Sequence, residues 1–202
     1  MASPEVRREL LELLAKYAYD FKPGGFTLVS GQKSDEYLDC KMALSRAEAL
    51  PLTGALFLSH VDPTAVAVGG LTMGSDPIAI STAHVSAGAR PLRWFSVRKD
   101  AKEHGKKKVI EGDVQPGDSV VVVDDVVTTG GSTIQAIQKC REFGLRVVQV
   151  LVLVDREQDG GIEGIKAVAG GDVAVQALFT KSEVRQEWER LKSAAPGARA
   201  SG

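Results

Sequence analysis

Two adjacent carboxylates, Asp124 and Asp125, follow a run of four valines and precede a segment rich in hydroxyl groups and glycine, "VVVVDDVVTTGGST" from Val120 to Thr133. A loop that leads into a helix offers backbone N–H groups and the positive end of the helix dipole to an anion, most often phosphate. Gly130 and Gly131 let the backbone approach such an anion closely. The carboxylate pair suits the vicinal hydroxyls of a ribose. The segment therefore predicts a site for a ribose 5-phosphate.

Side-chain hydroxyls in the same segment can donate to phosphate oxygens. The alternative is that the aspartates only end a buried strand and Ser132 only caps a helix, which are ordinary roles for these residue types. Two other phosphate-binding motifs are absent, because the sequence contains neither G-x-x-x-x-G-K-[ST] nor G-x-G-x-x-G. The predicted hydroxyl donors are Thr128, Thr129, Ser132 and Thr133.

Apolar runs alternate with helical patterns from the middle of the chain onward. Strands are predicted at 64–70, 91–97, 118–125, 146–155 and 173–179, and helices at 3–19, 46–60, from 76 onward and at 132–143. Continuous apolar runs are typical of strands covered on both faces, so we predict a parallel α/β sheet with crossover helices. Ligands of such sheets bind beyond the carboxyl ends of the strands. With Val120 to Val123 as the buried strand, Asp124 and Asp125 should emerge at its end.

The N-terminal third has a different pattern. Ser3 is a plausible N-cap and Pro4 a plausible first residue of an amphipathic helix. The stretch "FTLVSGQKSDEYLDCKMAL" then contains short strand-like pieces around turn signals. This region is predicted to form a small flap over the core.

The composition argues against nucleic-acid-binding, membrane-spanning and secreted proteins. A chain of 202 residues with 44% hydrophobic residues can bury a full core, and its net charge of -1 gives no reason to expect binding to nucleic acid or to an anionic membrane. Cys40 and Cys140 have no metal-ligand spacing and are interpreted as reduced thiols, with a disulfide as the alternative. The N-terminus has no signal-peptide pattern, and no apolar run approaches the roughly 20 residues of a membrane span. We expect a cytoplasmic protein.

The segment around Asp124 and Asp125 resembles the phosphoribosyl diphosphate (PRPP) signature of type I phosphoribosyltransferases. The resemblance implies an α/β fold with a central parallel sheet flanked by helices and a small N-terminal hood. It also implies transfer of ribose 5-phosphate from PRPP to a nitrogenous base, with Mg2+ carried mainly by the PRPP diphosphate and no metal site made by the protein itself. The PRPP-binding residues that it implies are Thr72, Met73, Arg98, Lys99, Lys102, His104, Asp124, Asp125, Val126, Val127, Thr128, Thr129, Gly130, Gly131 and Ser132.

A second segment, "RKDAKEHGKKK" from Arg98 to Lys108, holds six lysines or arginines and His104. A charge run of this kind is usually a solvated loop. Its spacing, however, resembles the R-K-x-x-K-x-H-G loop of orotate phosphoribosyltransferases, where cations stabilise the departing diphosphate. By this resemblance Lys102 and His104 are catalytic together with Asp124 and Asp125, and the loop reaches into the site of the other subunit of a homodimer.

Further stretches resemble the same family. "FTLVSGQKSDEYLDCK" resembles the segment near the orotate ring, and "VGGLTMGSDPIA" resembles the diphosphate loop. Arg156 follows a predicted strand and could hold orotate as a guanidinium fork, although a surface ion pair is the alternative. Several relatives carry lysines where this chain has Val29 and Met73, so Lys41 is a candidate replacement for the missing charge. The orotate-binding residues implied are Thr128, Arg156 and Lys41.

The resemblance to orotate phosphoribosyltransferases implies an enzyme of that family, which makes orotidine 5-phosphate in pyrimidine synthesis with PRPP and orotate as its ligands. The predicted divisions are a helix and hood at 1–60, a PRPP-binding core at 61–182, and a C-terminal helix and tail at 183–202. One alternative is another type I transferase that acts on a purine or another base. A second alternative is a PRPP-sensing regulator without catalytic activity.

Overall fold

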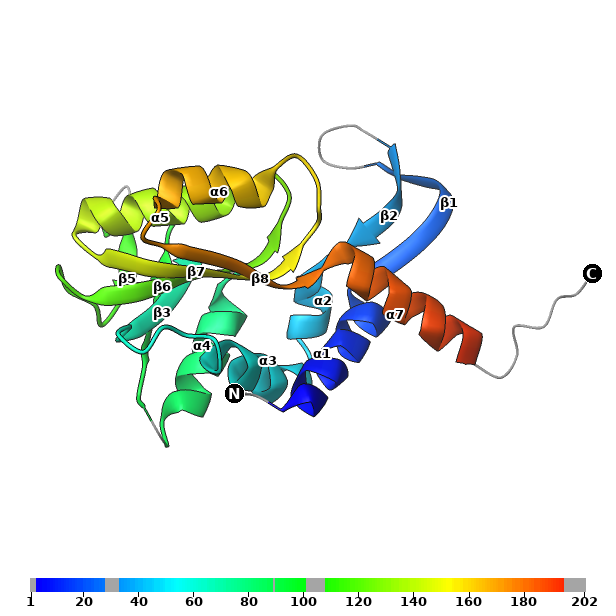
Figure 1. The fold of residues 1–202 in the computed structure, drawn as a ribbon, viewed down its shortest axis with the longest axis horizontal. Helices are drawn as coiled ribbons and strands as arrows, with labels where there is room; N and C mark the ends of the chain where they lie inside the picture. Colours follow the sequence, from blue (N-terminus) through cyan, green and yellow to red (C-terminus); the bar gives the residue numbers. More distant parts are fainter. Residues whose placement is uncertain (1–2, 28–32, 89, 101–107, 195–202) are drawn as a thin grey trace, which may run out of the picture.

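The computed structural model describes residues 3–27, 33–88, 90–100 and 108–194, and its centre is a six-stranded sheet. The strands lie in the order β5-β4-β3-β6-β7-β8, and all neighbours are parallel except β4 and β5 (Figure 1). The bounds are β3 Ala67–Leu71, β4 Arg93–Val97, β5 Ile110–Gly112, β6 Ser119–Val127, β7 Arg146–Asp155 and β8 Ala174–Thr180. The predicted parallel α/β sheet is confirmed.

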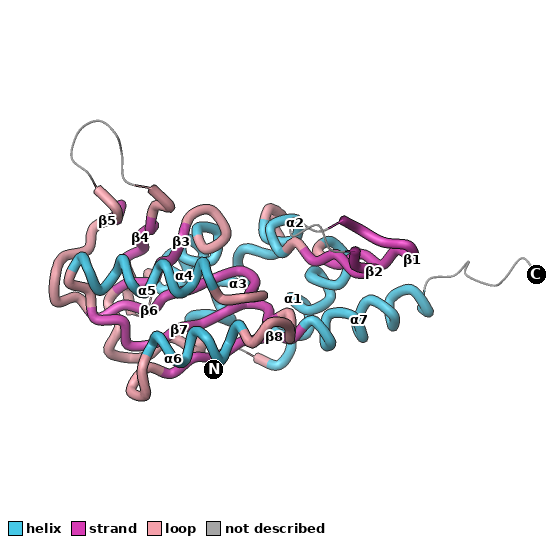
Figure 2. The backbone as a smooth tube through the Cα atoms, turned by 90° about the horizontal axis from the view of Figure 1, so that it is seen from above, coloured by secondary structure: helices cyan, strands magenta, loops and turns pink. Residues whose placement is uncertain are grey.

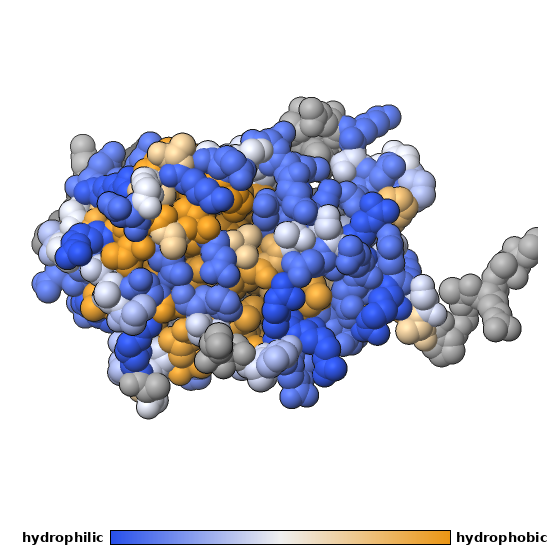
Figure 3. Space-filling model, in the orientation of Figure 1, coloured by the Kyte–Doolittle hydropathy of each residue, from blue (hydrophilic) through white to orange (hydrophobic). Residues whose placement is uncertain are grey.

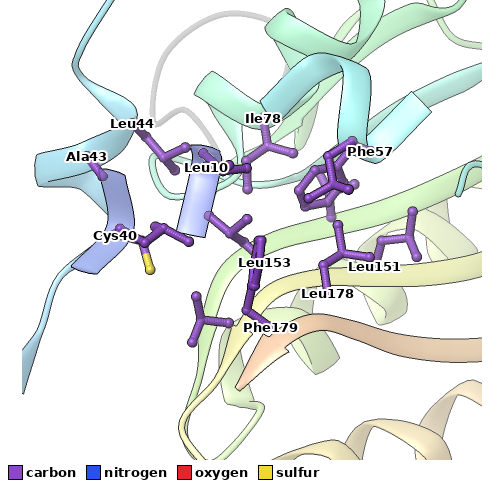
Figure 4. Close-up of a cluster of buried hydrophobic side chains, with 14 of the residues drawn as sticks. Leu10, Cys40, Ala43, Leu44, Phe57, Ile78, Leu151, Leu153, Leu178 and Phe179 are labelled. Carbon is purple, nitrogen blue, oxygen red and sulfur yellow. The ribbon is translucent and has the colours of Figure 1, made fainter. Parts of the chain in front are cut away.

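Helices cover both faces of this sheet (Figure 1). One face packs against α5 (Gly131–Phe143) and α6 (Gly161–Ala169), and the other packs against α1 (Pro4–Tyr17), α3 (Ala49–Leu58) and α4 (Asp76–Ser86). Because both faces are covered, Val120 to Val123 of β6 are buried whichever way they point, which explains the unbroken apolar run. Figure 4 shows the larger core, where side chains of α1, α3 and α4 meet those of β7 and β8.

The predicted flap is a two-stranded hood. Strand β1 (Tyr19–Thr27) pairs antiparallel with β2 (Lys33–Leu38), and the short helix α2 (Cys40–Leu44) follows at once. Figure 2 shows the hood at one end of the molecule beside α1 and α7 (Lys181–Ala194). Trp188 of α7 lies 5.5 Å from the ring of Tyr19 and 6.2 Å from that of Phe21. Aromatic packing therefore holds the hood against the C-terminal helix.

The start of the first helix is confirmed, since Ser3 Oγ accepts a hydrogen bond from Val6 N and Pro4 begins the helix, but the helix ends at Tyr17 and Tyr19 already belongs to β1. Other boundaries were wrong. The helix predicted at 46–60 begins only at Ala49, and the separate helix α2 was not predicted. The short edge strand β5 was also missed, because three residues carry too little pattern to stand out.

The prediction for the central strand was wrong at its end. Strand β6 continues through Val127, so Asp124 and Asp125 lie inside it and not after it. Val126 and Val127 still pair with β7, opposite Val154 and Asp155. The pairing of β7 at these positions keeps the backbone extended past the two acidic residues.

The connections place a topological switch between β3 and β6. From β3 the chain moves to β4 on one side, and it then returns to β6 on the other side and continues outward to β7 and β8. The loops after β3 and β6 therefore run in opposite directions and leave a crevice at the carboxyl ends of the strands, where ligands of open α/β sheets bind.

The surface is mixed in character. On the face seen in Figure 3, hydrophobic residues show mainly over the half of the molecule that holds the sheet, and the half with α7 is mostly hydrophilic. Within the described residues, no helix has the length and apolar character needed to cross a membrane.

Candidate active site

The carboxylate pair lies at the switch point and is buried, with Asp124 4% and Asp125 5% exposed. Asp124 accepts hydrogen bonds from Thr133 Oγ1 at 2.6 Å and from Asp125 N at 3.0 Å. Asp125 Oδ1 accepts from Val126 N at 2.9 Å. Among the described residues, the second oxygen of Asp125 has no hydrogen-bond donor. A buried acceptor of this kind suits a ligand that brings its own hydroxyl group.

Burial raises the pKa of Asp124 to about 7, and the hydrogen bond from Thr133 offsets only part of this shift. Burial also raises the pKa of Asp125, against the opposing charge of Lys41. Two acids that share a buried site resist full ionisation, because each charge disfavours the other and neither is well solvated. A ligand with hydroxyl donors or positive charge would favour their ionised forms.

The loop after β3 approaches this pair closely. A Cβ atom on Gly74 would lie 2.4 Å from Asp125 Oδ1, so only glycine fits there without a shift. Thr72 Oγ1 donates to Asp76 at 2.6 Å, and Ser96 of β4 donates to the other oxygen of Asp76 at 2.8 Å. The Thr72–Met73 peptide is cis, and the Met73 side chain is 70% exposed. Thr72 and Met73 therefore border the crevice on the side of β3.

The loop after β6 runs from Thr128 to Gly130 and leads into α5. Gly130 has a φ of +79°, and a Cβ atom there would lie 2.8 Å from Gly161 O. Both the backbone conformation and the lack of space therefore require glycine at this position. Thr129 and Ser132 are exposed around the start of α5, whose first N–H groups face the same crevice edge. The loop and the first turn of α5 thus form a continuous segment with the composition of an anion site, which comprises Thr128, Thr129, Gly130, Gly131 and Ser132.

Thr133 corrects one prediction. Its hydroxyl was expected to donate to the ligand, but it is buried in α5 and donates to Asp124. Thr133 reaches Asp124 because the chain turns back between β6 and α5. The spacing of nine residues in the sequence does not by itself predict this contact.

Lys41 reaches the site from α2. Its Nζ atom lies 2.7 Å from Asp39 Oδ1 and 3.7 Å from Asp125 Oδ2, and its side chain is half exposed. Asp39 also accepts from Lys41 N as the N-cap of α2. The hood segment therefore brings a cation to within ion-pair distance of the carboxylate pair.

Arg156 follows β7 at the same edge. Its backbone N donates to Val127 O at 2.9 Å, and its guanidinium donates to Leu38 O of the hood. Its Nε atom is buried and has no hydrogen-bond acceptor among the described residues. Because a buried guanidinium donor without an acceptor is costly, Arg156 is suited to a ligand acceptor and not to a surface ion pair.

Arg98 and Lys99 directly follow β4. Strand β3 lies between β4 and β6, the strand that carries the carboxylate pair. Arg98 Nη1 is 3.8 Å from Glu111 Oε1, and Lys139 Nζ of α5 donates to Arg98 O at 2.8 Å and to Lys99 O. Lys99 itself is exposed. The predicted catalytic residues Lys102 and His104, as well as Val29, lie outside the described residues.

Tertiary structure thus brings Asp124, Asp125, Lys41 and Gly74 together, with Arg156 on the neighbouring strand. Sequence reasoning missed Asp39, Gly74, Asp76 and Lys139. The sequence did offer one signal for Gly74, because this glycine lies within the segment that resembles the diphosphate loop. The roles of the others depend on contacts between elements far apart in the chain.

Comparisons with known proteins show which proteins this chain is similar to. Residues 66–169 match the family described as phosphoribosyl transferase domain. The chain is 42% identical over 188 residues to an orotate phosphoribosyltransferase of Synechocystis sp., with 92% of each chain covered. It resembles Mycobacterium tuberculosis H37Rv orotate phosphoribosyltransferase in complex with Fe(III) dicitrate at a TM-score of 0.76 and 36% identity, covering 89% of this chain and 98% of that chain. For the mycobacterial enzyme in complex with PRPP, the TM-score is 0.71 at 30% identity, with 90% and 93% covered.

Proposed function

Since the chain belongs to the orotate phosphoribosyltransferase family, we propose that it joins orotate to the ribose 5-phosphate of PRPP in the crevice between β3 and β6, using the residues that line it. The observation that carries this assignment is the buried carboxylate pair Asp124 and Asp125, with Gly74 against it and Lys41 3.7 Å away. A buried acidic pair beside a glycine- and hydroxyl-rich loop fits a phosphorylated sugar, because the sugar supplies hydroxyl donors and the loop supplies phosphate donors.

In this proposal the 5-phosphate binds in the loop from Thr128 to Ser132, and Asp124 and Asp125 accept hydrogen bonds from the ribose hydroxyls. The loop at Thr72 and Met73 faces the diphosphate. When the bond at the anomeric carbon breaks, the ribose gains positive charge, and nearby carboxylates stabilise it. The side chain of Val127 is buried in the core, so Val127 would contribute only through its backbone, and Val126 N holds Asp125 by donating to its Oδ1.

Mg2+ is proposed as a companion of PRPP. The described residues contain no group of three His, Cys, Asp or Glu side chains that could hold a metal ion. Mg2+ is commonly bound by one or two carboxylates together with substrate phosphates, so the carboxylate pair fits an ion that arrives with the diphosphate. When bound, the ion would neutralise charge on the departing diphosphate.

Orotate is proposed to bind between the hood and Arg156. The support is the Nε of Arg156, which has no acceptor among the described residues and suits the substrate carboxylate, and the cation Lys41, whose Nζ lies 3.7 Å from Asp125 Oδ2. Thr128 is half-buried next to this region and could donate to the base. Lys41 would supply the charge that Val29 and Met73 do not carry.

A homodimer is proposed as the working form. Its support is an apolar groove of about 590 Å³ between α2, α3 and α4, next to the diphosphate loop. Leu50 and Ile80 are 37% and 46% exposed in its lining, which is unfavourable for a surface that stays in water. Lys102 and His104 would act on the diphosphate across this interface.

A cytoplasmic location is proposed because Cys40 and Cys140 are buried free thiols.

The test is turnover of purified protein. Orotate absorbance should fall when PRPP and Mg2+ are both present, and hypoxanthine, guanine and uracil should not replace orotate. Turnover of a purine at a comparable rate would favour a different base specificity. PRPP binding without turnover of any base would favour a regulator.

A further inference from the structure

Glu36 is a carboxylate close to the proposed orotate site that the reaction does not use. It lies on β2, two residues before Leu38, so the two side chains point to the same face of the hood. Two residues along a strand span about 7 Å. Glu36 and Arg156 both line one small cavity of about 10 Å³, together with Ser34, Gln158 and Lys181. Glu36 is the one acidic side chain among the described residues of this lining.

Both oxygens of Glu36 are engaged by side chains other than Arg156. Oε1 accepts from Tyr19 at 2.6 Å and lies 3.3 Å from Arg185, and Oε2 accepts from Lys181 Nζ at 2.6 Å. The ion pair with Lys181 is well shielded, since the side chains are 17% and 18% exposed. Burial raises the pKa of Glu36, but hydrogen bonds from Lys181 and Tyr19 outweigh it and leave the pKa below its ordinary value. Glu36 is therefore ionised and fully occupied at neutral pH.

The start of α7, which carries Lys181, lies next to both Glu36 and the loop of Arg156. Lys181 is the first residue of α7, which starts where β8 ends and runs beside the hood (Figure 1). Glu157, the neighbour of Arg156, accepts hydrogen bonds from Ser182 N at 2.9 Å and from Ser182 Oγ at 2.5 Å. The start of α7 therefore touches both the hood carboxylate and the loop that carries Arg156.

We propose that Lys181 is a positioning residue that sequesters Glu36, so that the guanidinium of Arg156 stays free for the carboxylate of the substrate. Without Lys181, Oε2 of Glu36 would lose its counter-charge, and of the described cations only Arg185, 3.3 Å from Oε1, would remain. Arg156 lines the same cavity, and its Nε has no acceptor among the described residues. Glu36 and Arg156 would pair, and Glu36 would compete with orotate. This inference rests on the proposed role of Arg156.

The experiment measures orotate and PRPP Michaelis constants and kcat for four proteins. Lys181→Met should raise the orotate KM about tenfold and leave kcat and the PRPP KM within twofold. Adding Glu36→Gln to it should restore the orotate KM to within twofold of wild type, although the double variant lacks both partners. Lys166→Met, an exposed lysine on α6, is the matched control and should behave as wild type.

The rescue separates sequestration from a structural role. If Lys181 only held the hood in place, the double variant would bind orotate as poorly as Lys181→Met, and that result would overturn the proposal. An unchanged orotate KM in Lys181→Met would overturn it as well. Should Lys181→Met fold poorly, Tyr19→Phe removes the closer of the two donors at Oε1 and leaves Arg185 there, so a smaller rise in the orotate KM and the same rescue by Glu36→Gln are expected.

An Arg156→Ala variant distinguishes this inference from the function on which it rests. A raised orotate KM in Arg156→Ala, with no effect of Lys181→Met, rejects the sequestration alone. An unchanged orotate KM in Arg156→Ala rejects both the role of Arg156 and the inference built on it.

Discussion

Replacing Asp124 by Asn should stabilise the folded protein while it impairs the proposed PRPP site. The amide has the shape of the carboxylate, and its oxygen can still accept from Asp125 N while its NH2 group donates to the hydroxyl of Thr133. Only the buried charge is removed. Stability and ligand binding should therefore change in opposite directions.

The magnitude follows from the raised pKa. Burial shifts the pKa of Asp124 from an ordinary value of 3.8 to about 7, and each unit corresponds to about 1.4 kcal/mol. Asp124 holds its proton more tightly in the folded state than in the unfolded state, so its contribution to the stability of the wild type is greatest below about pH 4 and is lost as the pH rises to about 7. The advantage of Asp124→Asn should therefore be small at pH 4, grow by about 1.4 kcal/mol per pH unit, and level off near 4 kcal/mol above pH 7.

Urea unfolding at pH 4, 6 and 8 measures this difference, with Asp172→Asn as a control at an exposed carboxylate. Calorimetry at pH 8 measures the binding of PRPP with Mg2+, and the affinity of Asp124→Asn for PRPP should be at least tenfold lower than that of the wild type. Equal stability of wild type and variant at pH 8, or an advantage that shrinks as the pH rises, would refute the argument from buried charge. Wild-type PRPP affinity in a folded variant would refute the assignment of the ribose site.

Three other outcomes test the site. Arg156→Ala should raise the orotate KM about 10- to 100-fold, as expected for a lost charge-assisted pair, with little change in PRPP binding; equal weakening of both substrates would mean that Arg156 is structural. Gly74→Ala should raise the PRPP KM at least tenfold, because the new Cβ would lie 2.4 Å from Asp125, whereas Gly88→Ala, with nothing within 4 Å of its Cβ, should act as wild type. Lys102→Ala chains mixed with Asp125→Asn chains should regain up to about half of the wild-type activity per heterodimer, since one of two shared sites carries both defects. Verified heterodimers that stay inactive would show that the loop serves its own subunit.

The sequence by itself was sufficient for the class of fold and for the central motif. Unbroken valine runs are compatible only with strands covered on both faces or with a buried helix, and their short length with flanking glycines favours strands. The hydroxyl- and glycine-rich segment after Asp125 is local chemistry, because a loop and the helix that it enters are contiguous in the chain. These features are short-range, so they can be read from neighbouring residues.

Tertiary structure decided what surrounds that motif. The length of β6 depends on its pairing with β7, which carries the strand through Val127. The contact of Gly74 with Asp125 requires β3 and β6 to be neighbours, and the approach of Lys41 requires the hood to fold over the sheet. Glu36 and Lys181 are 145 residues apart, yet they form one of the shortest ion pairs in the protein. Such contacts follow from strand order and packing between distant elements, and no local pattern in the sequence encodes the distance between two side chains.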